Sequence, residues 1–109
     1  MIEIDPHKAV EYIFDNAPEY AKAKGRLAEL EVFKSSLKAI LMKNSYETAI
    51  GAQEREAYAD PKYQELAKAI GEATEQAELL KYRLESAKLR IEVWRTQEAN
   101  NWDCCYAIS

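Results

Sequence analysis

The sequence predicts an all-α fold, a long antiparallel helical hairpin that is similar to a coiled coil and carries a short N-terminal helix. Its 109 residues include only three glycines and three prolines, too few for a β-sandwich, in which turn residues recur about every 10 positions. Apolar residues instead recur three and four positions apart, which is the period of one helix face. The length predicts a single helical domain over residues 1–109.

The N-terminal segment carries a helix-start signal. Asp5 can cap a helix and Pro6 fits its first position. A short helix over about 6–17 would place four apolar residues on one side: Val10, Ile13, Phe14 and Ala17. Pro18 is expected to end this helix and to begin the next one.

Two long helices are expected over about 19–58 and 61–100, because neither range contains an internal proline. Asp60 followed by Pro61 repeats the start signal, and the short break before it predicts antiparallel helices. The apolar pattern weakens before Gly51, so a separate helix over about 46–58 is an alternative. Residues 101–109 are expected to form an irregular tail.

Both long helices carry a seam of apolar residues alternately three and four positions apart, which is typical of coiled coils. In the second helix the seam consists of Tyr63, Leu66, Ile70, Ala73, Ala77, Leu80, Leu84, Ala87, Ile91 and Trp94. In the first helix it consists of Tyr20, Ala23, Leu27, Leu30, Leu37 and Leu41, with Phe33 and Ile40 beside it. We expect the two seams to pack together.

The second long helix carries a further apolar stripe on its opposite face: Leu79, Tyr82, Leu89 and Val93. A hairpin seam cannot bury both faces of a helix, and leaving a large apolar side chain in water forgoes about 1.5–3 kcal/mol. We therefore expect the N-terminal helix or a second copy of the chain to cover the stripe. A homo-oligomer is expected, with a two-fold dimer as the first choice.

Basic residues are concentrated in two segments although the net charge is −4. Residues 22–43 hold six basic and two acidic side chains, and residues 81–95 hold five and two. The candidate nucleic-acid-binding residues are Lys22, Lys24, Arg26, Arg83, Lys88, Arg90 and Arg95. A hairpin that turns near 59–60 would bring the first three toward Arg95, where an exposed aromatic ring could stack on single-stranded DNA. Alternatively, these cations pair with carboxylates of the neighbouring helix.

The sequence offers no pattern that is typical of an enzyme. His7 is the sole histidine and lies beside a helix start, and the two cysteines, Cys104 and Cys105, are neighbours, so neither a catalytic group nor a metal site is expected. The isolated glycines form no phosphate-binding loop, so no cofactor or small-molecule substrate is expected. No membrane-spanning run or basic leader is present in the sequence, which favours a cytoplasmic protein.

Two stretches resemble a family of small helical proteins encoded by bacteriophages and prophages, often beside genes for single-strand annealing recombinases. They read TAIGAQEREAYADPKY over 48–63 and LRIEVWRTQEANN over 89–101, with weaker likeness at Tyr12 and over 17–21. The resemblance covers about 12–101, and the tail from Trp102 onward departs from the small polar ends of the family. It implies a phage setting inside a bacterial host cell.

The resemblance and the basic segments together indicate a non-enzymatic phage accessory protein that binds DNA or a phage recombinase in DNA recombination or replication. The alternative is a structural coiled-coil adaptor that recognises another protein through the apolar stripe. A host-directed inhibitor is a third possibility, for which the sequence names no target.

Overall fold

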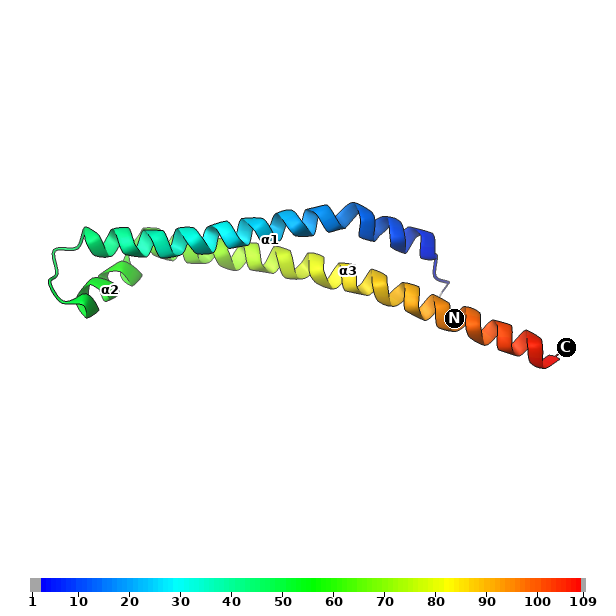
Figure 1. Ribbon diagram of the computed structural model, residues 1–109. Coiled ribbons are helices and arrows are strands. Elements are labelled where there is room, and N and C mark those ends of the chain that lie inside the picture. Colours follow the sequence, from blue (N-terminus) through cyan, green and yellow to red (C-terminus); the bar gives the residue numbers. More distant parts are fainter. Residues whose placement is uncertain (1–2, 109) are drawn as a thin grey trace. The chain divides into compact units, whose positions relative to one another are not determined.

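The chain is all-helical in its computed structural model, which describes the backbone of residues 3–108 and the side chains of residues 3–101. Helix α1 spans Pro6–Lys43, α2 spans Ile50–Ala59 and α3 spans Pro61–Ile108 (Figure 1), and no strand occurs within the described part. The predicted all-α fold is therefore confirmed.

The contacts divide the chain into two compact units. The first unit combines Met1–Ala21 with Leu79–Ser109, and the second is Lys22–Glu78. Within each unit a stretch of α1 runs antiparallel to a stretch of α3, as predicted. The interpretation of residues 1–109 as one domain stays a prediction.

Both predicted helix starts are confirmed by their hydrogen bonds. The Asp5 carboxylate accepts hydrogen bonds from the backbone amides of His7 at 3.0 Å and Lys8 at 3.3 Å. The Asp60 carboxylate accepts one from the amide of Lys62 at 2.8 Å. Each aspartate thus satisfies amides of the first helical turn that have no partner inside the helix.

The predicted end of a short helix at Pro18 is wrong, because α1 continues through this proline to Lys43. Pro18 removes the hydrogen bond to the carbonyl of Phe14, but both residues lie on the exposed face, where water can satisfy that carbonyl. The side chain of Asn16 also donates to the backbone carbonyl of Tyr12 at 2.9 Å. The apolar seam of α1 continues on the opposite face of the helix. Its packing against α3 therefore outweighs the tendency of Pro18 to end the helix.

The predicted continuous helix over 19–58 is also wrong, and the alternative of a separate short helix is the correct one. The chain leaves helical conformation between Lys43 and Ile50. The Ser45 side chain supports this turn, since its hydroxyl accepts a hydrogen bond from the amide of Glu47 at 3.1 Å and donates one to the carboxylate of Glu56. Serine favours such local bonds over a continued helix.

The irregular tail predicted for 101–109 is wrong for the backbone of residues 101–108, which belongs to α3. No proline follows Pro61 and no glycine follows Gly71, so no helix-breaking residue interrupts the last part of α3. The side chains of Cys104 and Cys105, and position 109, lie outside the described residues.

The seams form the core of both units. All ten seam residues predicted on α3 are buried or half-buried, as are the six predicted on α1. The α1 seam extends further than predicted, in unbroken steps of four and three, through Ala9, Ile13, Asn16, Tyr20, Ala23, Leu27, Leu30, Lys34, Leu37 and Leu41. Phe33 and Ile40 lie outside it and are exposed.

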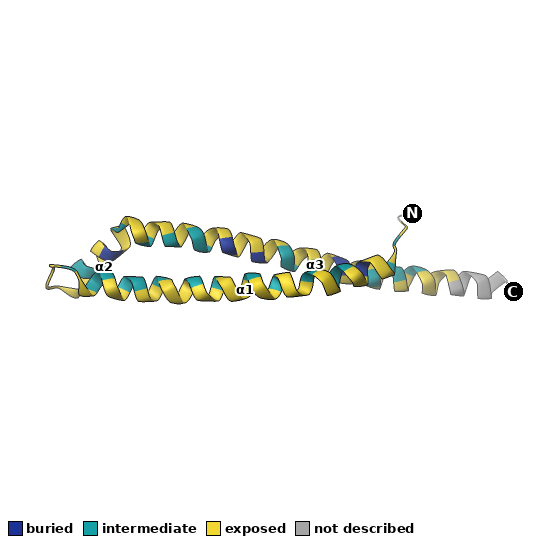
Figure 2. Cartoon of the chain, turned by 90° about the horizontal axis from the view of Figure 1, so that it is seen from above, coloured by how far each residue is buried: buried dark blue, intermediate teal, exposed yellow. Residues whose placement is uncertain are grey.

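Alanines make up the fully buried part of this core. In the first unit Ala9 and Ala87 are buried, and in the second unit Ala57, Ala73 and Ala77 are buried. No large side chain within the described residues is fully buried. Most positions along the described helices are exposed (Figure 2). The helices therefore approach closely through small side chains, and much apolar surface is left uncovered.

Candidate functional site

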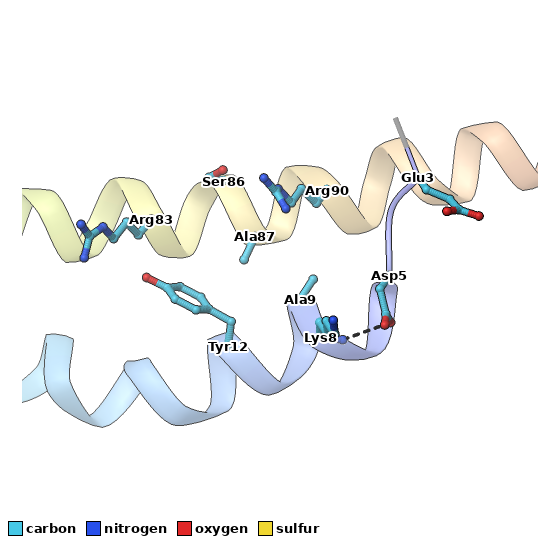
Figure 3. Close-up of a pocket in the computed structure, with 9 residues that line it drawn as sticks. All are labelled: Glu3, Asp5, Lys8, Ala9, Tyr12, Arg83, Ser86, Ala87 and Arg90. Atoms are coloured by element: carbon cyan, nitrogen blue, oxygen red, sulfur yellow. Dashed lines mark hydrogen bonds between the residues drawn. The ribbon is translucent and has the colours of Figure 1, made fainter. Parts of the chain in front are cut away.

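The first unit contains an open groove of about 590 Å³ between the start of α1 and the second half of α3. Its lining residues are Glu3, Asp5, Lys8, Ala9, Tyr12, Arg83, Ser86, Ala87 and Arg90. In Figure 3 the ring of Tyr12 extends from α1 toward α3, and its hydroxyl is directed to the side on which Arg83 lies. Ala9 and Ala87 point toward each other at the base of the groove.

Arg83 and Arg90 are the cations that α3 contributes to this groove. They are seven residues apart, which places them on one helix face with about 10 Å of axial rise between them. Among the described residues, neither guanidinium has a carboxylate within ion-pair distance. The nearby Asp5 carboxylate already accepts two backbone amides of α1. The two arginines therefore have charge available for a group outside this unit.

A second set of cations lies on the other side of the α3 seam. Because the helix repeats every 3.6 residues, Lys81, Lys88 and Arg95 share one face that is turned away from the groove. We call these three residues the lateral row. None of them forms an ion pair within the described residues, and the ammonium group of Lys81 lies 5.9 Å from the ring centroid of Tyr82.

The same side of α1 presents apolar residues. Val10, Phe14 and Ala17 follow one another on the face of α1 that lies across the seam from the groove. Phe14 is 79% exposed, so its ring is open to a ligand. The sequence pattern grouped these three residues with Ile13 on one side, which is correct only in part: Ile13 is half-buried in the α1 seam, whereas the other three are exposed.

Of the seven predicted nucleic-acid-binding residues, the four in the first unit lie on two faces of α3. Arg83 and Arg90 lie together in the groove, whereas Lys88 and Arg95 belong to the lateral row. The other three, Lys22, Lys24 and Arg26, are exposed residues of the second unit. That these three residues lie close to Arg95 stays a prediction.

The predicted apolar stripe is exposed in the chain. Leu79, Tyr82, Leu89 and Val93 are between 46% and 61% accessible to solvent. The first turns of α1 pack on the opposite face of α3, through Ala9 against the seam at Ala87. Of the two covers predicted for the stripe, the N-terminal helix is therefore wrong, and a second copy of the chain stays a prediction. No described part of the chain takes the place of the N-terminal helix.

The second unit holds a cluster that sequence reasoning did not find. The ammonium group of Lys38 on α1 lies 3.8 Å from the carboxylate of Glu54 and 4.8 Å from the ring centroid of Tyr58, both on α2. Tyr58 in turn packs edge-on against Tyr63 of α3, with 5.3 Å between ring centroids. A hydrogen bond with Tyr58 raises the pKa of Lys38, and the charge of Glu54 adds to this effect. This cluster attaches α2 to the two longer helices.

Other kinds of site are not evident in the described part of the chain. Residues 3–101 contain no group of three histidine, cysteine or acidic side chains placed to hold a metal ion. No described helix combines the length and the apolar character that a membrane span requires.

Comparison with known proteins gives no relative. The chain matches no family model, and neither a curated protein nor a solved structure shows significant similarity to it. The groove, the lateral row and the apolar stripe are therefore the features of the chain that bear on its function.

Proposed function

We propose that the chain is a non-enzymatic accessory protein of phage DNA recombination or replication, and that it binds single-stranded DNA through the lateral row of α3. The observation that carries the proposal is the row itself: three cations at a seven-residue spacing, none of them neutralised by an ion pair within the described residues. The resemblance to small phage proteins supplies the biological setting.

The neighbouring surface of α1 supports a nucleic-acid ligand over other anions. Proteins that hold single-stranded DNA combine a cationic track for the phosphates with aromatic rings on which bases stack. Phe14 is exposed on the same side of the α1–α3 pair as the lateral row. Lysine and arginine can contact phosphates while this ring supplies a face for a base.

The test is the salt dependence of binding to a labelled single-stranded oligonucleotide, measured by fluorescence anisotropy. Each phosphate contact on single-stranded DNA contributes about −0.7 to the slope of log affinity against log salt concentration. The double variant Lys88→Gln, Arg95→Gln should therefore make the slope shallower by about 1.4. The double variant Lys62→Gln, Lys68→Gln makes the same charge change on exposed positions of α3 outside the row and should leave the slope unchanged.

Phe14 is tested separately. Phe14→Leu keeps an apolar side chain but removes the ring, and stacking on one base is worth about 1–3 kcal/mol. Affinity should fall at least fivefold at every salt concentration, with no change in the slope. The absence of any binding at about 50 mM salt would contradict the proposed function.

The second candidate function is a protein-interaction adaptor, and the exposed apolar stripe favours it. Leu79, Tyr82, Leu89 and Val93 are large exposed apolar side chains on the outer face of α3, with Ser86 between Tyr82 and Leu89, and such a row is unusual for a surface that stays in water. An adaptor would bind its partner through this stripe with no dependence on the lateral row. Loss of partner binding on Leu89→Asp, with Lys88→Gln unchanged, is the result expected for it.

A further inference from the structure

The apolar stripe has sharp ends along α3. The positions that continue it toward the N-terminus are Glu72 and Glu75, and those that continue it toward the C-terminus are Thr96 and Asn100, all of them exposed. Between these ends, the four apolar residues and the exposed Ser86 in their middle lie alternately three and four positions apart. The stripe is thus a second coiled-coil seam of two heptads, on the face of α3 opposite to the first seam.

Charged residues of opposite sign flank this second seam. Glu78 and Glu85 each come immediately before a seam position, and Arg83 and Arg90 each come immediately after one. The seam therefore has glutamates along one edge and arginines along the other. Such flanking charges determine which partner a coiled coil accepts and in which direction the helices run.

The spacing of these charges selects a parallel arrangement. In two parallel helices in register, a residue before one seam position lies beside the residue five positions later on the other helix. Glu85 would then meet Arg90 of a second copy, and Glu78 would meet Arg83. In an antiparallel pair centred on Ser86, Arg90 would instead face Arg83, and the glutamates would face each other, so both edges would repel.

We infer that a second copy of this chain occupies the apolar stripe, with the two α3 helices parallel and in register. Each stripe residue then packs against its own counterpart, and Glu85 pairs with Arg90 of the other copy across both edges. This arrangement gives partners to the two groove arginines, which form no ion pair with any described residue of their own chain. It leaves the lateral row free, so it does not depend on DNA binding.

Sedimentation equilibrium over a concentration series tests the inference. The mass should approach twice the 12.5 kDa of the chain. Arg90→Glu brings two glutamates together at each edge of the dimer and should raise the dissociation constant about tenfold. Glu85→Arg brings two arginines together at each edge and should raise it by the same factor. The double variant Glu85→Arg, Arg90→Glu restores opposite charges at each edge and should return the dissociation constant to the wild-type value. Arg95→Glu makes the same charge change off the seam and is the matched control.

Cross-linking tests the direction of the helices. In a background with Cys104→Ser and Cys105→Ser, a chain with Val93→Cys should form a disulfide with itself on mild oxidation, because position 93 meets its own counterpart. Cross-linking of Val93→Cys to Leu79→Cys in a mixture, with no self-linked product, would show an antiparallel pair and overturn the inference. A mass of one chain at all concentrations, any mass other than two chains, or tighter association of Arg90→Glu would also overturn it.

Discussion

Replacement of Leu89 by aspartate gives a quantitative test of the apolar stripe. Leu89 is 59% exposed in the single chain, and complete burial of a leucine side chain is worth about 1.5–3 kcal/mol. Covering the exposed part is therefore worth about 1–2 kcal/mol for each copy. A two-fold dimer contains Leu89 twice, so the variant loses about 2–4 kcal/mol of association free energy, and the dissociation constant should rise at least 30-fold.

The assay is sedimentation equilibrium, with far-UV circular dichroism to verify that the variant keeps its helix content. Val32→Asp is the matched control, because Val32 is 63% exposed on α1 and lies outside the stripe. It introduces the same charge into a helix without touching the stripe and should leave association unchanged. An unaltered dissociation constant for Leu89→Asp would show that the stripe does not lie in an interface between two copies. A partner other than a second copy would bury Leu89 only once, so its affinity would fall by a smaller factor, about 5- to 30-fold.

Two further predictions concern the stability of the helices. Gly25 lies inside α1 with open space where a Cβ would be, so Gly25→Ala should stabilise the protein by about 1 kcal/mol and raise the Tm by a few degrees. Lys38→Met should lower stability by removing the contacts with Glu54 and Tyr58. Because the folded protein raises the pKa of Lys38, its contribution is complete below the ordinary value of 10.5 and is lost as the pH rises through the raised pKa. Urea unfolding should show a difference from the wild type at about pH 8 that disappears at high pH.

The helical fold could be predicted because its signals are local or periodic. The caps at Asp5 and Asp60 depend on residues next to them in the chain, and both seams follow from steps of three and four. Pro18 misled the prediction, because a proline signal is local whereas the seam that continues past it is not. The same period, carried from residue 20 back to residue 9, would have revealed one helix.

The candidate site could be predicted only in part from the sequence. The count of charges along the sequence grouped Arg83, Lys88, Arg90 and Arg95 in one basic segment. The helical repeat of 3.6 residues per turn places them on two different faces of α3. The Lys38 cluster could not be predicted, because it depends on how α2 folds back after the turn at 44–49. Such contacts are set by tertiary packing and leave no periodic signal.

The opposed alanines in the first unit have a consequence for folding. A heptad seam allows two helices to slide by seven residues while apolar groups still face apolar groups. Asn16 cannot prevent such an error, because its amide is already bonded within its own helix. Sliding by seven would instead bring Leu80 or Trp94 to the place where Ala87 faces Ala9, and either bulky group would force the backbones apart. Side-chain volume, rather than polarity, thus penalises the misaligned state in this part of the molecule.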